Sequence, residues 1–279
     1  MKVHKALEDD FRTELLKLYQ AQKKVVIQRY VDAQVGDKDS PATYVSPVEL
    51  YPPGETDEQV MEVCNYYIAK GYLDGAEQKA NQYRELVAKG LFDRITDLLA
   101  GVGKKLKEGI EKVLTTVFNR EYWAELGKTT RDRLERMIQR GLKEGKTVEE
   151  MVELLEEDQS GAFNEERVDN ITRTETTGAL NGGGYLVGGW IAADGTHYTD
   201  EWVGILDNKI RPAHRRADGT VRNDQGLFDV GGELARYPGD PMLSPGQRCN
   251  CRCWTIVVES PYPVSTDFEV EDFFEGEMI

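Results

Sequence analysis

The chain changes its construction near residue 161, and this change constrains the fold more than any single motif. The first 161 residues carry apolar side chains at helical spacing and a single tryptophan, Trp123. The remainder holds the other three tryptophans, three of the four cysteines and, apart from Lys209, only arginine as a basic residue. We therefore predict an extended helical N-terminal module over 1–161. A compact α+β domain with a small, mostly antiparallel sheet should follow over 162–260, and a tail over 261–279.

The first module is expected to be almost entirely helical. Apolar residues recur three or four positions apart over 1–34, 104–118 and 130–142. Gly, Pro, Ser and Asp crowd into 36–53, which indicates a loop. Thr147 and Glu150 have the spacing of a capping box and predict a further helix start.

The second module should begin with a helix capped by Asn164 and stopped by the three glycines at 182–184. The residues beyond them alternate between β-rich runs and turn signals, including Asp194-Gly195. They predict strands at 190–192, 201–206 and 254–258.

One face of the helix that begins at Asn164 is polar and cannot simply be core. It carries Asn170, Arg173, Thr177 and Asn181, which lie three or four positions apart. Glu175 lies about 200° around the helix from Arg173. Arg173 and Glu175 are therefore expected to reach separate partners in the following sheet.

Charge and hydropathy argue against a chain that binds nucleic acid over its whole surface and against one that spans a membrane. The net charge is −15, so phosphates are repelled unless basic residues cluster. Basic residues do group at 104–112 and 131–143, but interleaved glutamates favour a solvated helix face there. Apolar runs are too short to span a bilayer, and the charged N-terminus does not resemble a signal peptide, so no membrane partner is expected.

The run Cys249-Asn-Cys251-Arg-Cys253 is the strongest candidate for metal chemistry. In an extended chain the three thiols would share one side, with adjacent Cα atoms about 7 Å apart, so two could grip one metal. With His214 and one further group, such as Asp207 or the third cysteine, they would complete a zinc site. The other interpretations are a disulfide, which an intracellular chain disfavours, and plain reduced thiols.

The segment from Asp207 through Arg211 to His214 crowds an acid, an arginine and an imidazole into one turn-rich stretch. These side chains could form an acid–base group with an oxyanion clamp. They could equally form a buried polar network with Arg173 and Glu175. The network is favoured, because no nucleophile elbow or phosphate-binding glycine loop accompanies them.

The tail over 261–279 carries six acidic residues, no basic residue, and phenylalanines at 268, 273 and 274. It is either a frayed, solvated end or a docking peptide whose aromatic side chains anchor on a partner.

Taken in order, the motifs of the second module resemble the Mu F-like family of phage minor head, or head morphogenesis, proteins. The resemblance covers about 168–257, and its motifs are Thr172-Arg-Thr-Glu175, Asn181, Trp202, Asp207-x3-Arg211-x2-His214, Gly219, Phe228, Pro238 and Asn250-Cys-Arg-Cys253. Cys249 stands where the family usually has an apolar residue. This departure favours Cys251 and Cys253, with His214, as the ligands.

The resemblance implies a low-copy virion component inside the head near the portal vertex, assembled in the host cytoplasm. Its partners would be the portal protein and the major capsid protein, with packaged DNA as a further partner. It implies no established reaction, so we expect a structural protein without a catalytic set. The expected polar network comprises Arg173, Glu175, Asn181, Asp207 and Arg211. The alternatives are a metal-dependent hydrolase or transferase using Glu175, Arg211 and His214, and a DNA-binding ejection protein.

Overall fold

The computed structural model describes residues 2–87, 92–192, 198–223 and 225–260. The chain folds into two compact units, each assembled from stretches far apart in the sequence. Unit 1 comprises Met1–Glu8, Tyr66–Val117 and Arg173–Ile279, and unit 2 comprises Asp9–Asn65 and Phe118–Thr172. These units follow contacts rather than chain order, and the expected division at residue 161 stays a prediction about sequence modules.

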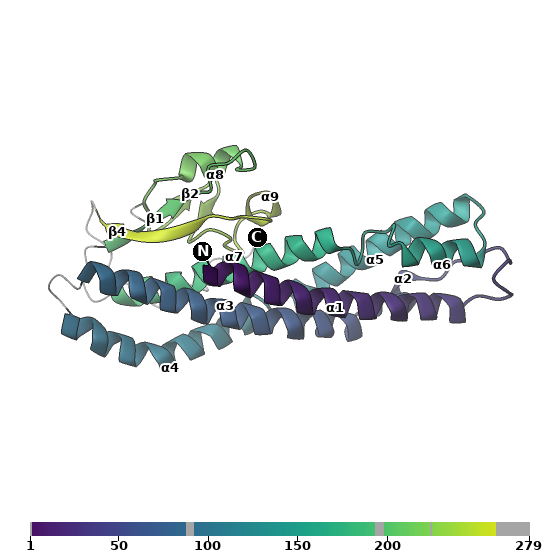
Figure 1. Cartoon of the computed structure of the whole chain (residues 1–279), viewed down its shortest axis with the longest axis horizontal. Helices are drawn as coiled ribbons and strands as arrows, with labels where there is room; N and C mark the ends of the chain where they lie inside the picture. The colour runs from purple at the N-terminus through teal and green to yellow at the C-terminus, as the bar shows by residue number, and fades with distance from the viewer. Residues whose placement is uncertain (1, 88–91, 193–197, 224, 261–279) are drawn as a thin grey trace. The chain divides into compact units, whose positions relative to one another are not determined.

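The α+β class is confirmed, with a predominantly helical N-terminal region and a small antiparallel sheet. The helices before the first strand, labelled in Figure 1, are α1 Lys2–Asp32, α2 Pro47–Leu50, α3 Glu55–Val87, α4 Phe92–Thr116, α5 Arg120–Lys143, α6 Val148–Glu156 and α7 Glu165–Ala192. The predicted capping box is present, because Thr147 Oγ1 accepts from Glu150 N while the Glu150 carboxylate accepts from Thr147 N. Asn164 also caps α7 as predicted, its Oδ1 accepting from Arg167 N.

Unit 2 has an aromatic core formed by residues of α1 and of the segments that follow α2 and α6. Tyr19 on α1 meets Phe163 edge-on at 5.9 Å between ring centroids, and Tyr51 packs against Phe163 at the same distance with tilted rings. The buried indole of Trp123 donates to Asn65 Oδ1, so its polar N–H group is satisfied.

Unit 1 contains two small antiparallel sheets, followed in Figure 1 from green to yellow. Strand β1, Tyr198–Val203, pairs with β4, Trp254–Glu259, from Tyr198 opposite Glu259 to Val203 opposite Trp254. The second sheet is the short pair β2, Phe228–Asp229, and β3, Leu234–Ala235. The strand predicted at 254–258 is therefore confirmed, and the one predicted at 201–206 lies about three residues earlier. Helices α8, Pro212–Ala217, and α9, Pro245–Arg248, lie in the connections.

Two predictions about α7 were wrong. The helix does not stop at the glycines of 182–184, and 190–192 is its last turn rather than a strand. The glycines serve close approach to α3: a Cβ on Gly183 would lie 2.0 Å from the Tyr72 carbonyl oxygen, and one on Gly75 would lie 1.9 Å from that of Leu180. Glycine is thus required by backbone contact between two helices, which outweighs its weak helix propensity.

A buried cluster of charges joins α3 to the first sheet of unit 1. Asp200 on β1 accepts from Lys79 Nζ at 2.6 Å and from an Arg222 nitrogen at 2.7 Å. The ammonium also donates to Thr255 Oγ1 on β4, and the Arg222 guanidinium lies over the rings of Tyr185 and Phe228. One carboxylate therefore holds a helix, a strand and a loop together.

Two sequence predictions lie outside the described residues: the Asp194-Gly195 turn and the acidic tail over 261–279. Among the helices that the structure describes, none combines the length and the apolar character that crossing a bilayer requires.

Candidate metal centre

Three buried side chains converge in unit 1: His214 from α8, and Cys251 and Cys253 from the segment that leads into β4. The Nδ1 atom of His214 lies 3.4 Å from the Cys253 sulfur and 3.6 Å from the Cys251 sulfur. One ligand atom from each residue falls within 4.8 Å of the others. The group that the sequence predicted from spacing is therefore assembled in space, and the cysteines are present as free thiols.

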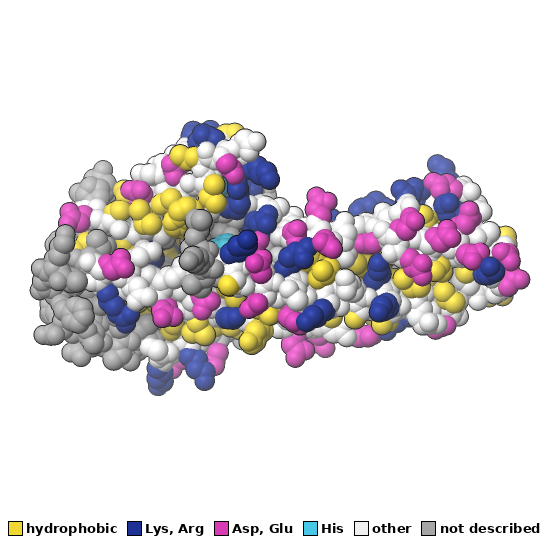
Figure 2. Space-filling model, viewed as in Figure 1, with side chains coloured by type: hydrophobic (Ala, Val, Ile, Leu, Met, Phe, Trp, Pro, Cys, Tyr) yellow, Lys and Arg dark blue, Asp and Glu magenta, His cyan; other side chains and the backbone are white. Residues whose placement is uncertain are grey.

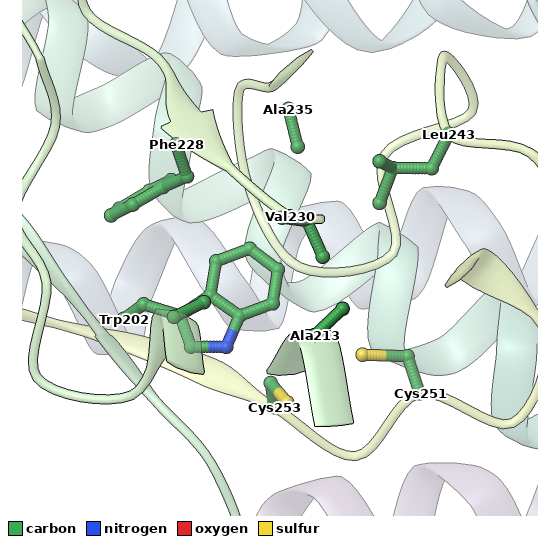
Figure 3. Packing of buried hydrophobic residues seen from close by; sticks show 9 residues of the cluster. Trp202, Ala213, Phe228, Val230, Ala235, Leu243, Cys251 and Cys253 are labelled. Atoms are coloured by element: carbon green, nitrogen blue, oxygen red, sulfur yellow. The ribbon is translucent and has the colours of Figure 1, made fainter. Parts of the chain in front are cut away.

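These separations suit a tetrahedral metal. Bond lengths of about 2.3 Å to sulfur and 2.0–2.1 Å to nitrogen place neighbouring nitrogen and sulfur ligands about 3.6 Å apart at the tetrahedral angle. The indole N–H of Trp202 points toward Cys253 (Figure 3), where a hydrogen bond from it favours the thiolate form that a metal requires. The three residues thus fit zinc, with Nδ1 and two sulfurs as ligands.

Cys249 does not join this group. It closes the short helix α9, and the next residue, Asn250, has a positive φ of 55°. This left-handed turn breaks the extended geometry that the sequence suggested, so the three thiols do not line one side of a strand.

The two thiols share a proton unequally. A hydrogen bond from Cys253 holds the pKa of the Cys251 thiol well below its usual value, against the opposing effect of burial and with further help from His214. The same hydrogen bond and burial raise the pKa of the Cys253 thiol. A metal that takes both sulfurs must displace the proton that the two thiols share.

Four of the five residues predicted as a polar network grip one segment, 247–253. Glu175 pairs with Arg248 at 2.7 Å, and Asp207 receives two hydrogen bonds of 2.7 Å from Arg252. Asn181 donates to the Cys253 carbonyl oxygen at 3.1 Å. The shared partner of these residues is the cysteine segment rather than one another.

Arg211 is the fourth of these residues and holds the segment at two points. Its guanidinium donates to the carbonyl oxygens of Gln247 and Cys249 at 2.6 Å each, while its Nε donates to Nε2 of His214 at 3.2 Å. The fifth residue, Arg173, pairs with Glu8 on α1. The partners of Arg173 and Glu175 are separate, as predicted, but they lie on α1 and α9 rather than in the sheet.

Ion pairing also affects the acidity of Asp207, one of the two carboxyl groups of this network. The hydrogen bonds from Arg252 hold the pKa of Asp207 well below its usual range. Because its carboxylate is committed to Arg252, Asp207 is not part of the His/Cys/Cys group, although the sequence had named it as a candidate fourth ligand.

Residues 132–256 match the family model described as phage Mu protein F like protein. This segment belongs to the Mu F-like family. The match begins within α5 and ends within β4, so it contains His214, both candidate cysteine ligands and the four network residues that hold the cysteine segment. The assignment indicates a phage head morphogenesis protein. No curated protein and no solved structure gives a match to the chain.

The Mu F-like segment also supplies a small apolar cluster that backs the cysteines. Figure 3 shows Cys251 and Cys253 on either side of Ala213, with Trp202 beside them and Phe228, Val230, Ala235 and Leu243 beyond. Trp202 packs edge-on against both His214 and Phe228. The imidazole and thiols are therefore held by packing as well as by hydrogen bonds.

The open side of the metal group faces a cavity of about 270 Å³. Its lining includes all three candidate ligands and four basic residues, Arg173, Lys209, Arg211 and Arg252. A group with three protein ligands and free space beside it leaves room for a fourth ligand.

Sequence reasoning missed several residues of this site. Arg248 and Arg252 flank the cysteines directly, but the run had been interpreted through its thiols alone. Thr174, whose hydroxyl accepts from Asn250 N at 2.9 Å, was also missed. Thr177, already placed on the polar face of the helix, donates to the Cys251 carbonyl oxygen at 2.8 Å. The spacing of Thr174, Thr177 and Asn181 on one helix was the available signal.

Proposed function

We propose that the protein is a minor structural component of a phage head. It would be present in low copy, bound near the portal inside the procapsid, and required for head assembly. The observation that carries the proposal is the Mu F-like match over 132–256. The buried and heavily braced surroundings of His214, Cys251 and Cys253 support a structural rather than a reactive centre.

The proposed partners follow from the same assignment. The helical stretch up to residue 161 would contact the portal protein and the major capsid protein, and packaged DNA would be a further partner during packaging or ejection. Protein detected in procapsids and virions, with matching density near the portal in electron micrographs of assembled heads, is the expected result. Absence of the chain from both particles would contradict the proposal.

The metal would be zinc, acting as a staple between α8 and the segment before β4. Elemental analysis of the purified chain is expected to give about one zinc per molecule. Cys251→Ser and Cys253→Ser should lose it, whereas Cys249→Ser is the matched control and should retain it. Equal zinc content in all four proteins would exclude this ligand set.

An enzymatic role is the second candidate, because a three-ligand group beside a cavity is also the arrangement of catalytic zinc sites. A metal-dependent hydrolase or transferase would use Glu175, Arg211 and His214. The Glu175 carboxylate is engaged by Arg248 at 2.7 Å and is absent from the lining of the cavity, which favours the structural role. Glu175→Gln tests the choice: a variant that folds, loads zinc and supports head assembly like the wild type would exclude catalysis by Glu175.

A further inference from the structure

The cavity beside the His/Cys/Cys group has a lining more basic than the protein as a whole. The chain carries a net charge of −15, yet four of the residues around this cavity are cationic and none is acidic. They come from three places in the sequence of unit 1: Arg173 on α7, Lys209 and Arg211 before α8, and Arg252 between the two cysteines. On the face shown in Figure 2, dark blue side chains gather around helix α8.

Part of this positive charge is balanced, and part is not. Arg173 is paired with Glu8, and Arg252 with Asp207. Neither Lys209 nor Arg211 forms an ion pair with a carboxylate anywhere in the described chain. Because Arg211 donates only to uncharged acceptors, no carboxylate of the described chain balances the charges of Lys209 and Arg211.

The donors suit a tetrahedral oxyanion. A guanidinium has five N–H groups, and the three hydrogen bonds of Arg211 leave two of them for a ligand. Arginine presents a planar fork that matches phosphate oxygens, while the exposed ammonium of Lys209 acts as a point charge. A volume of about 270 Å³ lies below the usual range for drug-sized ligands, so the cavity suits one phosphate group.

We propose that this cavity is a phosphate-binding site, formed by Arg211 and Lys209 with Arg173 and Arg252 at its edges and the His/Cys/Cys group as one wall. The ligand chemistry is a phosphate monoester, a phosphodiester or the free ion. The proposal does not depend on the head-assembly role, because it concerns only this cavity.

The test measures binding of inorganic phosphate, and separately of a short single-stranded DNA oligonucleotide, to the full-length chain by isothermal titration calorimetry at low salt. Both ligands are measured with zinc-free protein and with protein loaded with one equivalent of zinc. The variant is Lys209→Glu, which changes an exposed side chain without an ion pair and should not disturb folding. Lys24→Glu, at a position on α1 that is also exposed, is the control with the same change in net charge.

We expect Lys209→Glu to weaken phosphate binding about tenfold, since an attractive charge near the anion becomes a repulsive one. Lys24→Glu should bind phosphate like the wild type. If DNA binding weakens in parallel, the phosphate is supplied by a nucleic acid backbone. Phosphate binding that weakens while DNA fails to bind supports the site with a free phosphate or a monoester as ligand.

Two outcomes would overturn the proposal. One is the absence of phosphate binding at millimolar concentrations in both zinc states. The other is binding that Lys209→Glu and Lys24→Glu weaken equally, since that would reflect net charge rather than this cavity. Zinc content measured on the same samples keeps either failure separate from a failure of the zinc site.

Discussion

Replacing Asp200 by asparagine should unfold unit 1 more readily than any other single charge removal in its buried cluster. The carboxylate is shared by Lys79 and Arg222, and the three side chains are only 6%, 4% and 11% exposed. Asparagine has nearly the same size, so Asp200→Asn removes the charge without leaving a cavity. It leaves two buried cations without their common partner.

The magnitude follows from that imbalance. Breaking a buried ion pair by removing one member costs about 3–5 kcal/mol, because the charge left behind is uncompensated. Lys79→Met should cost less, about 1.5–3 kcal/mol, which is the usual contribution of a charged hydrogen bond. The methionine variant leaves Asp200 paired with Arg222, so no charge is orphaned.

Urea unfolding at pH 7, followed by circular dichroism, measures these differences in the free energy of unfolding. Glu259→Gln is the control: it makes the same chemical change at an exposed position of β4 and should stay within about 0.5 kcal/mol of the wild type. A loss for Asp200→Asn no larger than that for Lys79→Met would refute the reasoning, because the order depends on the orphaned charges.

The difference between wild type and Asp200→Asn should also depend on pH. Burial alone would raise the pKa of Asp200, but the charges of Lys79 and Arg222 lower it overall. A lowered folded-state pKa contributes stability above the unfolded value of about 3.9 and loses it as pH falls through the folded value. The difference should therefore be constant from about pH 5 to 8 and shrink below about pH 4.

Three further measurements test the fold. Gly183→Ala, whose Cβ would meet the Tyr72 carbonyl oxygen, should destabilise by more than about 2 kcal/mol, whereas Gly103→Ala, with open space around it in α4, should stabilise by about 0.5–1 kcal/mol; similar effects would contradict the close helix contact. Absorbance titration should find Tyr72 and Tyr19 unionised at pH 10, because burial raises the pKa of each to about 12, and early ionisation in the folded state would show that they are exposed. Thr147→Ala should cost about 0.5–2 kcal/mol in thermal unfolding by removing the cap of α6, and an unchanged midpoint would show that this capping box contributes nothing.

The sequence predicted those parts of the fold that local chemistry decides. Helix α6 and the start of α7 were placed correctly, because Thr147 and Asn164 act on backbone groups only a few residues away. The end of α7 was not, because glycines that usually stop a helix are used here for contact with α3, more than a hundred residues earlier. A periodicity argument has no access to such a distant partner.

The buried side-chain clusters divide in the same way: one could be predicted from the sequence and another could not. His214, Cys251 and Cys253 could be selected because few residue types bind metals and the chain contains few histidines and cysteines. The cluster of Lys79, Asp200 and Arg222 left no signal, since each residue is unremarkable among its neighbours and the three meet only after folding.

Arg211, which donates to the imidazole of His214, would compete with a metal for that ring. A neutral imidazole has one unprotonated nitrogen. The hydrogen bond from Arg211 requires this nitrogen to be Nε2, whereas a metal bound at Nδ1 requires it to be Nδ1. A metal held at Nδ1 would leave the ring proton on Nε2 and would release the Nε–H of Arg211, whose two carbonyl contacts would keep the guanidinium in place. The freed donor belongs to a side chain of the cavity wall, so metal and anion would each bind more tightly in the presence of the other.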